Sequence, residues 1–229
     1  MLLGKVISIV ALSAALLDGS MDVAMPDKNI DGRVFLVNRQ HALSQYYAPI
    51  DLRKTEVYGM SQSMRDEAAT ALESLFAAAK EAGVPLSSVS GYRSYSKQAT
   101  IYQRKVANTG SEKEADRLVA RAGTSEHQLG LAMDVARKGT SSLNSGFAKT
   151  KEGQWVYQNA HRFGFIVRYP EGYEDITGYD YEPWHIRYVG VEYATAIFNS
   201  GVPMETYMSG HRLEIYDFLI HQVTNEVLP

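Results

Sequence analysis

No cysteine occurs among the 229 residues of the sequence. A chain without thiols cannot form a disulfide scaffold, a thiolate zinc finger, an iron–sulfur site or a cysteine nucleophile. The chain also lacks a large excess of charge of either sign, because 23 Lys and Arg and 26 Asp and Glu give a formal net charge of −3. Nucleic-acid binding needs a dense basic surface, so we expect no nucleic-acid partner.

Repeats, low-complexity tracts and long linkers are missing after residue 27. Hydrophobic residues make up 45% of the chain and aromatic residues 10%, which is enough to bury a core and excludes extended disorder. The polar, turn-prone residues 26–29 are the expected border of this region. We therefore expect residues 27–229 to form one domain.

A long hydrophobic run is found at the N-terminus, where the uncharged residues 6–17 lie between Lys5 and Asp18. As a helix this run spans about 18 Å, well short of the roughly 30 Å hydrocarbon core of a bilayer. A short basic start, an apolar middle and a polar exit are typical of a secretory signal. We expect residues 1–20 to be a signal peptide or a membrane anchor, with a buried N-terminal helix as the alternative. The protein is then exported, to the extracellular space or the cell envelope.

Hydrophobic periodicity predicts helices that alternate irregularly with short strands. Helices are predicted over residues 63–82, 96–107, 111–123, 151–163 and 192–199, the first with a capping box at Ser63 and Asp66. Strands are predicted over residues 34–37, 86–92, 131–136, 165–169 and 185–189. Residues 38–60 are expected to wrap the core, and residues 204–229 to include a docking helix. The order predicts an α+β fold, with helices flanking a small central antiparallel sheet.

Polar residues gather in three segments where packing does not require them: residues 90–94, 125–134 and 182–185. His127 and Asp134 are too far apart to share an ion on one helix, but Gly130 predicts a turn between them. Asp134 would then lie on a strand that turns Met133 and Val135 to its other face. His185 begins another strand and can supply a third ligand. Two imidazoles and one carboxylate, with a fourth position left to water, are typical of a catalytic zinc site on the sheet.

Two further residues complete the expected chemistry. Glu182, three residues before His185, can accept the proton of a zinc-activated water and is the predicted general base. Arg93 is a permanent planar cation that suits a substrate carboxylate or a developing oxyanion. Trp184 is expected to exclude solvent and to line the substrate pocket. A single histidine is more often a packing or surface residue than a ligand, and His41, His161, His211 and His221 keep that interpretation.

The joint pattern resembles the VanY-type family of zinc D-alanyl-D-alanine carboxypeptidases, which includes the LdcB-type L,D-carboxypeptidases. The resemblance is carried by Ser125, His127, Gly130, Ala132 and Asp134 in the spacing SxHxxGxAxD, by Glu182-Pro183-Trp184-His185, and by residues 90–94 (SGYRS). It extends over about residues 35–201 and agrees with the predicted α+β fold.

The resemblance implies a role for each matching residue. His127, Asp134 and His185 would bind one zinc ion, with Glu182 as the base and Arg93 at the terminal carboxylate or the tetrahedral intermediate. Gln98, Ser125 and Tyr169 would line the substrate pocket. The implied function is removal of the terminal D-Ala from peptidoglycan stem peptides, and we predict no protein partner.

Three other functions remain open. A cell-wall endopeptidase of the same superfamily would use the same residues, although no wall-binding repeat is present. A non-catalytic zinc-binding module, as in Hedgehog signalling domains, would leave Glu182 without a role. A non-haem iron oxygenase also uses two histidines and a carboxylate, but it would leave Arg93 unexplained as well. The sequence does not distinguish D,D from L,D specificity.

Overall fold

The structure is a computed structural model that describes residues 32–210. The expected leader, residues 1–20, lies outside the described residues, as does the expected docking helix beyond Gly210. Within residues 32–210, no helix has both the length and the apolar character needed to cross a membrane.

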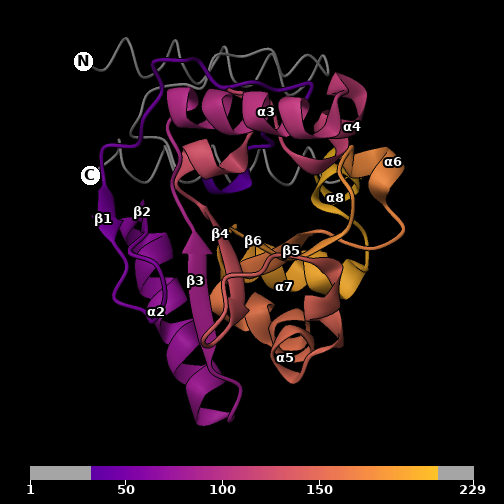
Figure 1. The fold of residues 1–229 in the computed structure, drawn as a ribbon. Coiled ribbons are helices and arrows are strands. Elements are labelled where there is room, and N and C mark those ends of the chain that lie inside the picture. The colour runs from indigo at the N-terminus through magenta and orange to yellow at the C-terminus, as the bar shows by residue number, and fades with distance from the viewer. Residues whose placement is uncertain (1–31, 211–229) are drawn as a thin grey trace, which may run out of the picture.

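A four-stranded antiparallel sheet forms the centre of the fold (Figure 1). Its strands lie in the order β3 (Leu86–Ser90), β4 (Ala132–Arg137), β6 (Glu182–Tyr188) and β5 (Phe165–Tyr169). A separate antiparallel pair is made by β1 (Leu52–Lys54) and β2 (Ser63–Arg65). The predicted α+β class with a small antiparallel sheet is therefore confirmed.

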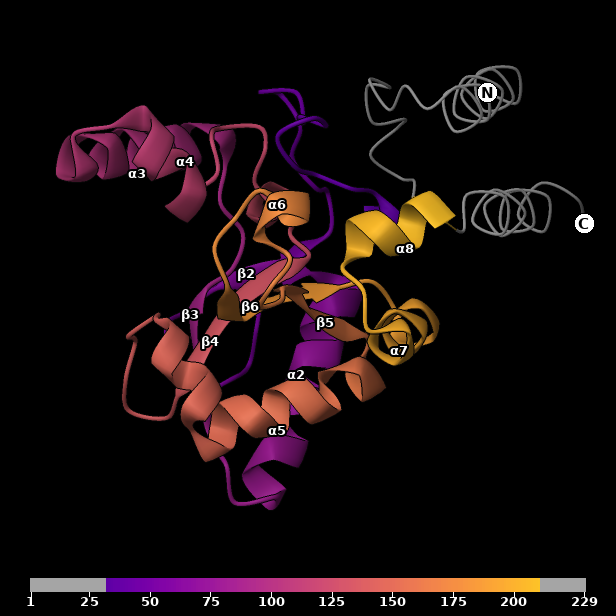
Figure 2. The same ribbon diagram turned by 90° about the vertical axis from the view of Figure 1, so that its right-hand side faces the viewer.

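Helices lie on both faces of this sheet. Figure 2 shows α2 (Asp66–Glu81) and α5 (Lys151–Asn159) on one side, and α3 (Tyr95–Thr109), α4 (Glu112–Leu118) and α6 (Glu174–Thr177) on the other. α7 (Val191–Ser200) and α8 (Met204–Gly210) pack at the β5 end. Short 3-10 turns occupy Gly32–Val34 (η1), Glu126–Leu129 (η2), Ser145–Lys149 (η3) and Ala160–Phe163 (η4).

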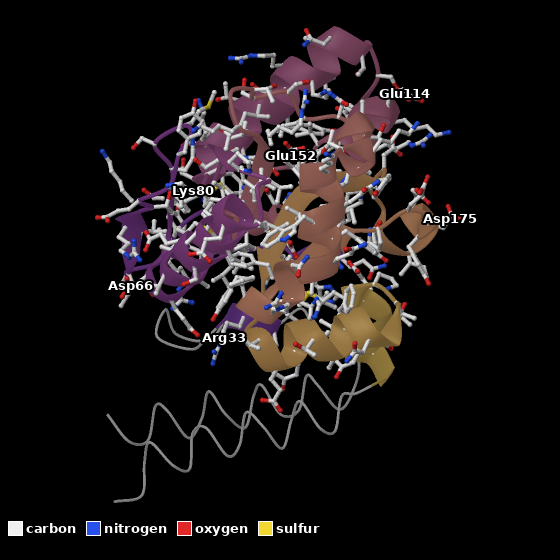
Figure 3. All side chains as sticks on the ribbon, turned by 90° about the horizontal axis from the view of Figure 1, so that it is seen from below. Arg33, Asp66, Lys80, Glu114, Glu152 and Asp175 are labelled. Carbon is white, nitrogen blue, oxygen red and sulfur yellow. The ribbon has the colours of Figure 1, made fainter. Side chains whose placement is uncertain are left out.

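The main hydrophobic core lies between the sheet and α2 and α5. Met133 and Val135 of β4 face this core, together with Leu72 of α2 and Val156 of α5. This confirms the predicted alternation along β4, which turns Asp134 to the opposite face. A second apolar cluster around α7 and α8 includes Val34 of η1. Charged side chains such as Glu114 and Asp175 project outward from the ribbon (Figure 3).

The predicted strand over residues 34–37 is wrong. Val34, Phe35 and Val37 are buried as an apolar run should be, but η1 ends at Val34 and no strand follows. The reason lies in the backbone carbonyls, because those of Gly32, Arg33 and Phe35 accept hydrogen bonds from Nη2 of the buried Arg187. The carbonyls are thus satisfied by a side chain instead of a neighbouring strand.

Several element ends also differ from the prediction. The capping box at Ser63 is wrong, because Ser63 belongs to β2 and α2 begins at Asp66 without a side-chain cap. The third helix starts as predicted with Ser111 as its N-cap but ends at Leu118. β6 begins at Glu182, three residues before the predicted start. Ser63 and Glu182 belong to strands because they pair with Lys54 and Tyr169, and such pairing is not contained in local periodicity.

Candidate active site and metal centre

The sheet register brings three of the predicted polar residues into one row across the sheet. Ser90 of β3 pairs with Asp134 of β4, which pairs with His185 of β6. Glu182 of β6 pairs with Tyr169 of β5. Residues directly opposite in an antiparallel pair project from the same face, so Ser90, Asp134 and His185 converge. The strand register shifts next to Ser90 and next to Tyr169. Such irregularities are common beside active sites, where they change the direction of a side chain.

His127 is placed by the turn η2, which precedes β4. Gly130 ends the turn with φ of 71°, and a Cβ at that position would lie 2.9 Å from Leu52 Cδ2, so only glycine fits. The ring Nδ1 of His127 lies 2.7 Å from the carbonyl oxygen of Gly91, and the Arg93 backbone N–H donates to the His127 carbonyl. The turn and the loop after β3 therefore hold each other in place.

The three predicted ligands meet in a buried cluster. One ligand atom from each of His127, Asp134 and His185 lies within 4.8 Å of the others. His185 Nδ1 is 3.1 Å from Asp134 Oδ1, and His127 Nε2 is 3.4 Å from Asp134 Oδ2. His127 Nε2 is buried and makes no hydrogen bond. A buried nitrogen lone pair aimed at a carboxylate and a second imidazole fits a cation, and two His with one Asp suit zinc.

The surroundings of the three residues shift their pKa values. Burial, together with the nearby Arg93, lowers the pKa of His127 to about 4, so its ring is neutral. Burial alone would raise the pKa of Asp134, but the hydrogen bond and charge of His185 help to hold that pKa well below its usual range. Burial would lower the pKa of His185, but hydrogen bonds to Asp134 and Glu126 raise it to about 9. Zinc must therefore displace a proton from His185 when it binds.

Glu182 lies beside the ligands without being one of them. Its Oε2 is 3.8 Å from Nδ1 of His185, the same nitrogen that faces Asp134. Burial raises the pKa of Glu182 to about 7, and the adjacent His185 offsets part of that shift. A general base works best with a pKa near the operating pH, so this environment suits a carboxyl group that accepts and returns a proton.

Arg93 is fixed on three sides. Its Nε donates to Ser90 Oγ, its Nη1 to Gln98 Oε1 at 2.9 Å, and its Nη2 to Asp134 Oδ2 at 3.0 Å. A guanidinium has five N–H groups, so one on each terminal nitrogen is left over. These two N–H groups are available to a carboxylate, the usual partner of a guanidinium.

All the predicted site residues line one cavity of about 380 Å³. They are Arg93, Gln98, Ser125, His127, Asp134, Tyr169, Glu182, Trp184 and His185. Gln98 is 1% exposed and spans from Arg93 to the Ala120 carbonyl, so it orients the guanidinium. The ring of Tyr169 packs 5.0 Å from that of His185. Trp184 is half-buried and packs against the main core.

Two features of the site were missed by sequence reasoning. Glu126, between Ser125 and His127 in the chain, is fully buried and reaches the far nitrogen of His185. The cavity is also lined by Ile101 and Lys105 of α3 and by Leu118 of α4. A signal for Glu126 was present, because Arg168 and Arg187 interrupt otherwise apolar strands and require a buried partner.

Comparison with known proteins agrees with this geometry. A family model described as VanY, D-alanyl-D-alanine carboxypeptidase, matches residues 61–191. A putative carboxypeptidase of Bacillus subtilis, YodJ, is 44% identical over 187 residues, which are 79% of this chain and 68% of that protein. A D-alanyl-D-alanine carboxypeptidase of Enterococcus faecalis is 38% identical over 77% of this chain and 65% of its own length.

Solved structures lead to the same group. The LdcB LD-carboxypeptidase has a TM-score of 0.71 at 45% identity, covering 76% of this chain and 84% of that chain. A vancomycin-resistance D,D-pentapeptidase VanY, solved in complex with Zn(II), has a TM-score of 0.67 at 38% identity, covering 78% and 99%. The fold and the site define a metallo-carboxypeptidase. The chain belongs to the VanY family of D-alanyl-D-alanine carboxypeptidases.

The assignment of the metal ligands predicts which histidines are needed for zinc. Wild-type protein is expected to bind one zinc ion, and His127→Ala or Asp134→Ala to bind none at micromolar zinc, because two remaining ligands cannot close the site. His161→Ala is the matched control, since His161 stacks on Phe198 away from the cluster. Equilibrium dialysis with metal analysis measures the stoichiometry. Full zinc content in His127→Ala would refute the assignment.

Proposed function

We propose that the protein is a zinc carboxypeptidase that removes the C-terminal D-Ala from peptidoglycan stem peptides. The observation that carries the proposal is the buried group His127, Asp134 and His185, with Glu182 beside it and Arg93 in the same cavity. A bound zinc ion would polarise the scissile carbonyl and make a water molecule acidic near neutral pH.

Glu182 carries the proton through the reaction. Its carboxylate accepts a proton from the attacking water, whose oxygen bonds to the carbonyl carbon. As the C–N bond breaks, the same group returns the proton to the amine of the departing D-Ala. The raised pKa of Glu182, about 7, allows both steps without a change of solvent pH.

Arg93 explains the preference for a chain end. Its two remaining N–H groups can pair with the terminal carboxylate of the substrate, and Gln98 and Ser90 hold the guanidinium in one orientation. An internal peptide bond offers no carboxylate at that position. This supports exopeptidase action over the endopeptidase alternative.

The first prediction from this function concerns substrate and base. We expect residues 21–229 with zinc to release one alanine from a stem pentapeptide ending in D-Ala-D-Ala, or from a tetrapeptide ending in D-Ala, and chelator to abolish the release. Glu182→Ala should keep its zinc and lose about 10²- to 10⁴-fold in rate, as expected for removal of a general base. Mass spectrometry of the peptides measures the release of alanine and its rate in wild type and Glu182→Ala. Cleavage of neither peptide by the zinc-loaded protein would favour an endopeptidase or a binding module.

A second prediction isolates the terminal carboxylate. Substrate with a C-terminal amide should be cleaved far more slowly than the free acid by wild-type protein, because the amide cannot form the charged pair with Arg93. Arg93→Ala should remove most of that difference while zinc content stays at one ion per chain. The ratio of kcat/KM for acid and amide measures it. An unchanged ratio in Arg93→Ala would show that another group binds the terminal carboxylate of the substrate.

We also propose that residues 1–20 direct export, so that the enzyme works in the cell envelope. The apolar residues 6–17 and the polar exit at Asp18 support this. Peptidoglycan peptides are found outside the cytoplasmic membrane, which agrees with the proposed substrate. We expect the full chain in the envelope or medium fraction, and a chain lacking residues 1–20 in the cytoplasm. Immunoblots of the fractions compare them, and equal cytoplasmic retention of both chains would overturn the proposal.

A further inference from the structure

The two histidine ligands are oriented by different kinds of group. His127 turns Nε2 to the metal cluster, and its Nδ1 lies against the Gly91 carbonyl. His185 does the reverse: Nδ1 faces Asp134, and Nε2 lies 3.4 Å from Oε2 of Glu126. For His185 to bind zinc through Nδ1, its proton must stay on Nε2. The neighbour of Nε2 therefore decides whether the ring can act as a ligand.

Glu126 is held as an ionised acceptor by two buried arginines. Its Oε1 accepts from Arg168 Nε at 2.7 Å and from Arg187 Nη1 at 2.8 Å. None of these three side chains is exposed to solvent. Oε2 is thus left as a charged acceptor directed at His185.

The arginines are in turn fixed by the two ends of the described chain. Arg168 forms a bidentate pair with Glu205 of α8, at 2.8 and 2.5 Å. Arg187 Nη2 donates to the carbonyls of η1 and Phe35. Two carboxylates and two guanidinium groups balance one another, as burial of charge requires. Both Glu205 and η1 lie outside residues 61–191, the segment that the family model matches.

We propose that Glu126 is the positioning residue that fixes the tautomer and orientation of His185, and that Glu205 acts on it through Arg168. The inference rests on the zinc site of the proposed function and adds α8 as a part of that site. Glu126 is not among the residues that line the cavity or among the three grouped ligands. Its effect should therefore appear in the affinity for zinc, independently of any peptide cleavage.

Glu126→Gln is the decisive variant. The amide oxygen can still accept from the arginines, but the amide NH2 would then face Nε2 of His185 and oppose a proton there. We expect about 10- to 100-fold weaker zinc binding, as for loss of other groups that orient a metal-ligating histidine. Glu205→Gln should weaken zinc binding in the same direction by less, because its amide oxygen still accepts one bond from Arg168. Competition with a chromophoric chelator, on the full chain, gives the zinc dissociation constants.

Glu73→Gln is the matched control. Glu73 of α2 also accepts from both terminal nitrogens of an arginine, Arg53, and α2 packs on the other face of the sheet. The three variants lose the same charge, so zinc binding by Glu73→Gln should equal that of wild type. Denaturant unfolding in chelator, which reports the zinc-free fold, separates lost stability from lost affinity.

Each outcome decides one part of the proposal. An unchanged dissociation constant in folded Glu126→Gln would overturn it, and an unchanged constant in Glu205→Gln would remove α8 from the site. If Glu126→Gln does not fold, Glu205→Gln carries the test, because Glu205 is 12% exposed and its loss leaves Glu126 paired. Wild-type protein that binds zinc but cleaves no stem peptide would refute the proposed function and leave this inference standing.

Discussion

The carboxylate of Asp134 is the group on which the rest of the site depends. Its side chain is only 4% exposed, and its two oxygens contact His185, His127 and Arg93. A buried carboxylate is costly unless it is paired, so the position demands cationic or hydrogen-bonding neighbours. The arginine satisfies part of that demand, and a zinc ion between the imidazoles would satisfy the remainder. The same carboxylate thereby links the metal cluster to the residue expected to hold the substrate.

Its position is set by packing on the opposite face of the sheet. Met133 and Val135 are fully buried against α2 and α5, and Asp134 projects away between them. A slip of one residue would turn the carboxylate into the apolar core and the two apolar side chains into the cavity. The hydrophobic core therefore fixes the register, and the register fixes which side chains meet across β3, β4 and β6. Stability and catalytic geometry have a common origin here.

The parts of this arrangement that depend on local pattern could be predicted from the sequence. Alternation along residues 131–136 placed Asp134 on the polar face, and the spacing of Glu182 and His185 placed a base beside a ligand. Contacts between distant segments could not be predicted in this way. Residues 34–37 have the composition of a strand, yet the carbonyls around them serve Arg187. The sequence predicts that Arg93 binds the substrate, and only the structure shows that three of its five N–H groups are already used.

The contrast between the two histidines shows where zinc affinity can vary within such a site. His127 leans on the Gly91 carbonyl, a backbone group that no side-chain substitution removes, in a position where a Cβ would lie 2.6 Å from the Ser63 carbonyl oxygen. His185 instead has the carboxylate of Glu126 beside its Nε2. A carboxylate partner makes an imidazole a more basic ligand than a carbonyl partner does. That carboxylate is held by side chains reaching to α8. Substitutions far from the substrate can therefore alter metal binding through His185 while His127 and the catalytic residues stay unchanged.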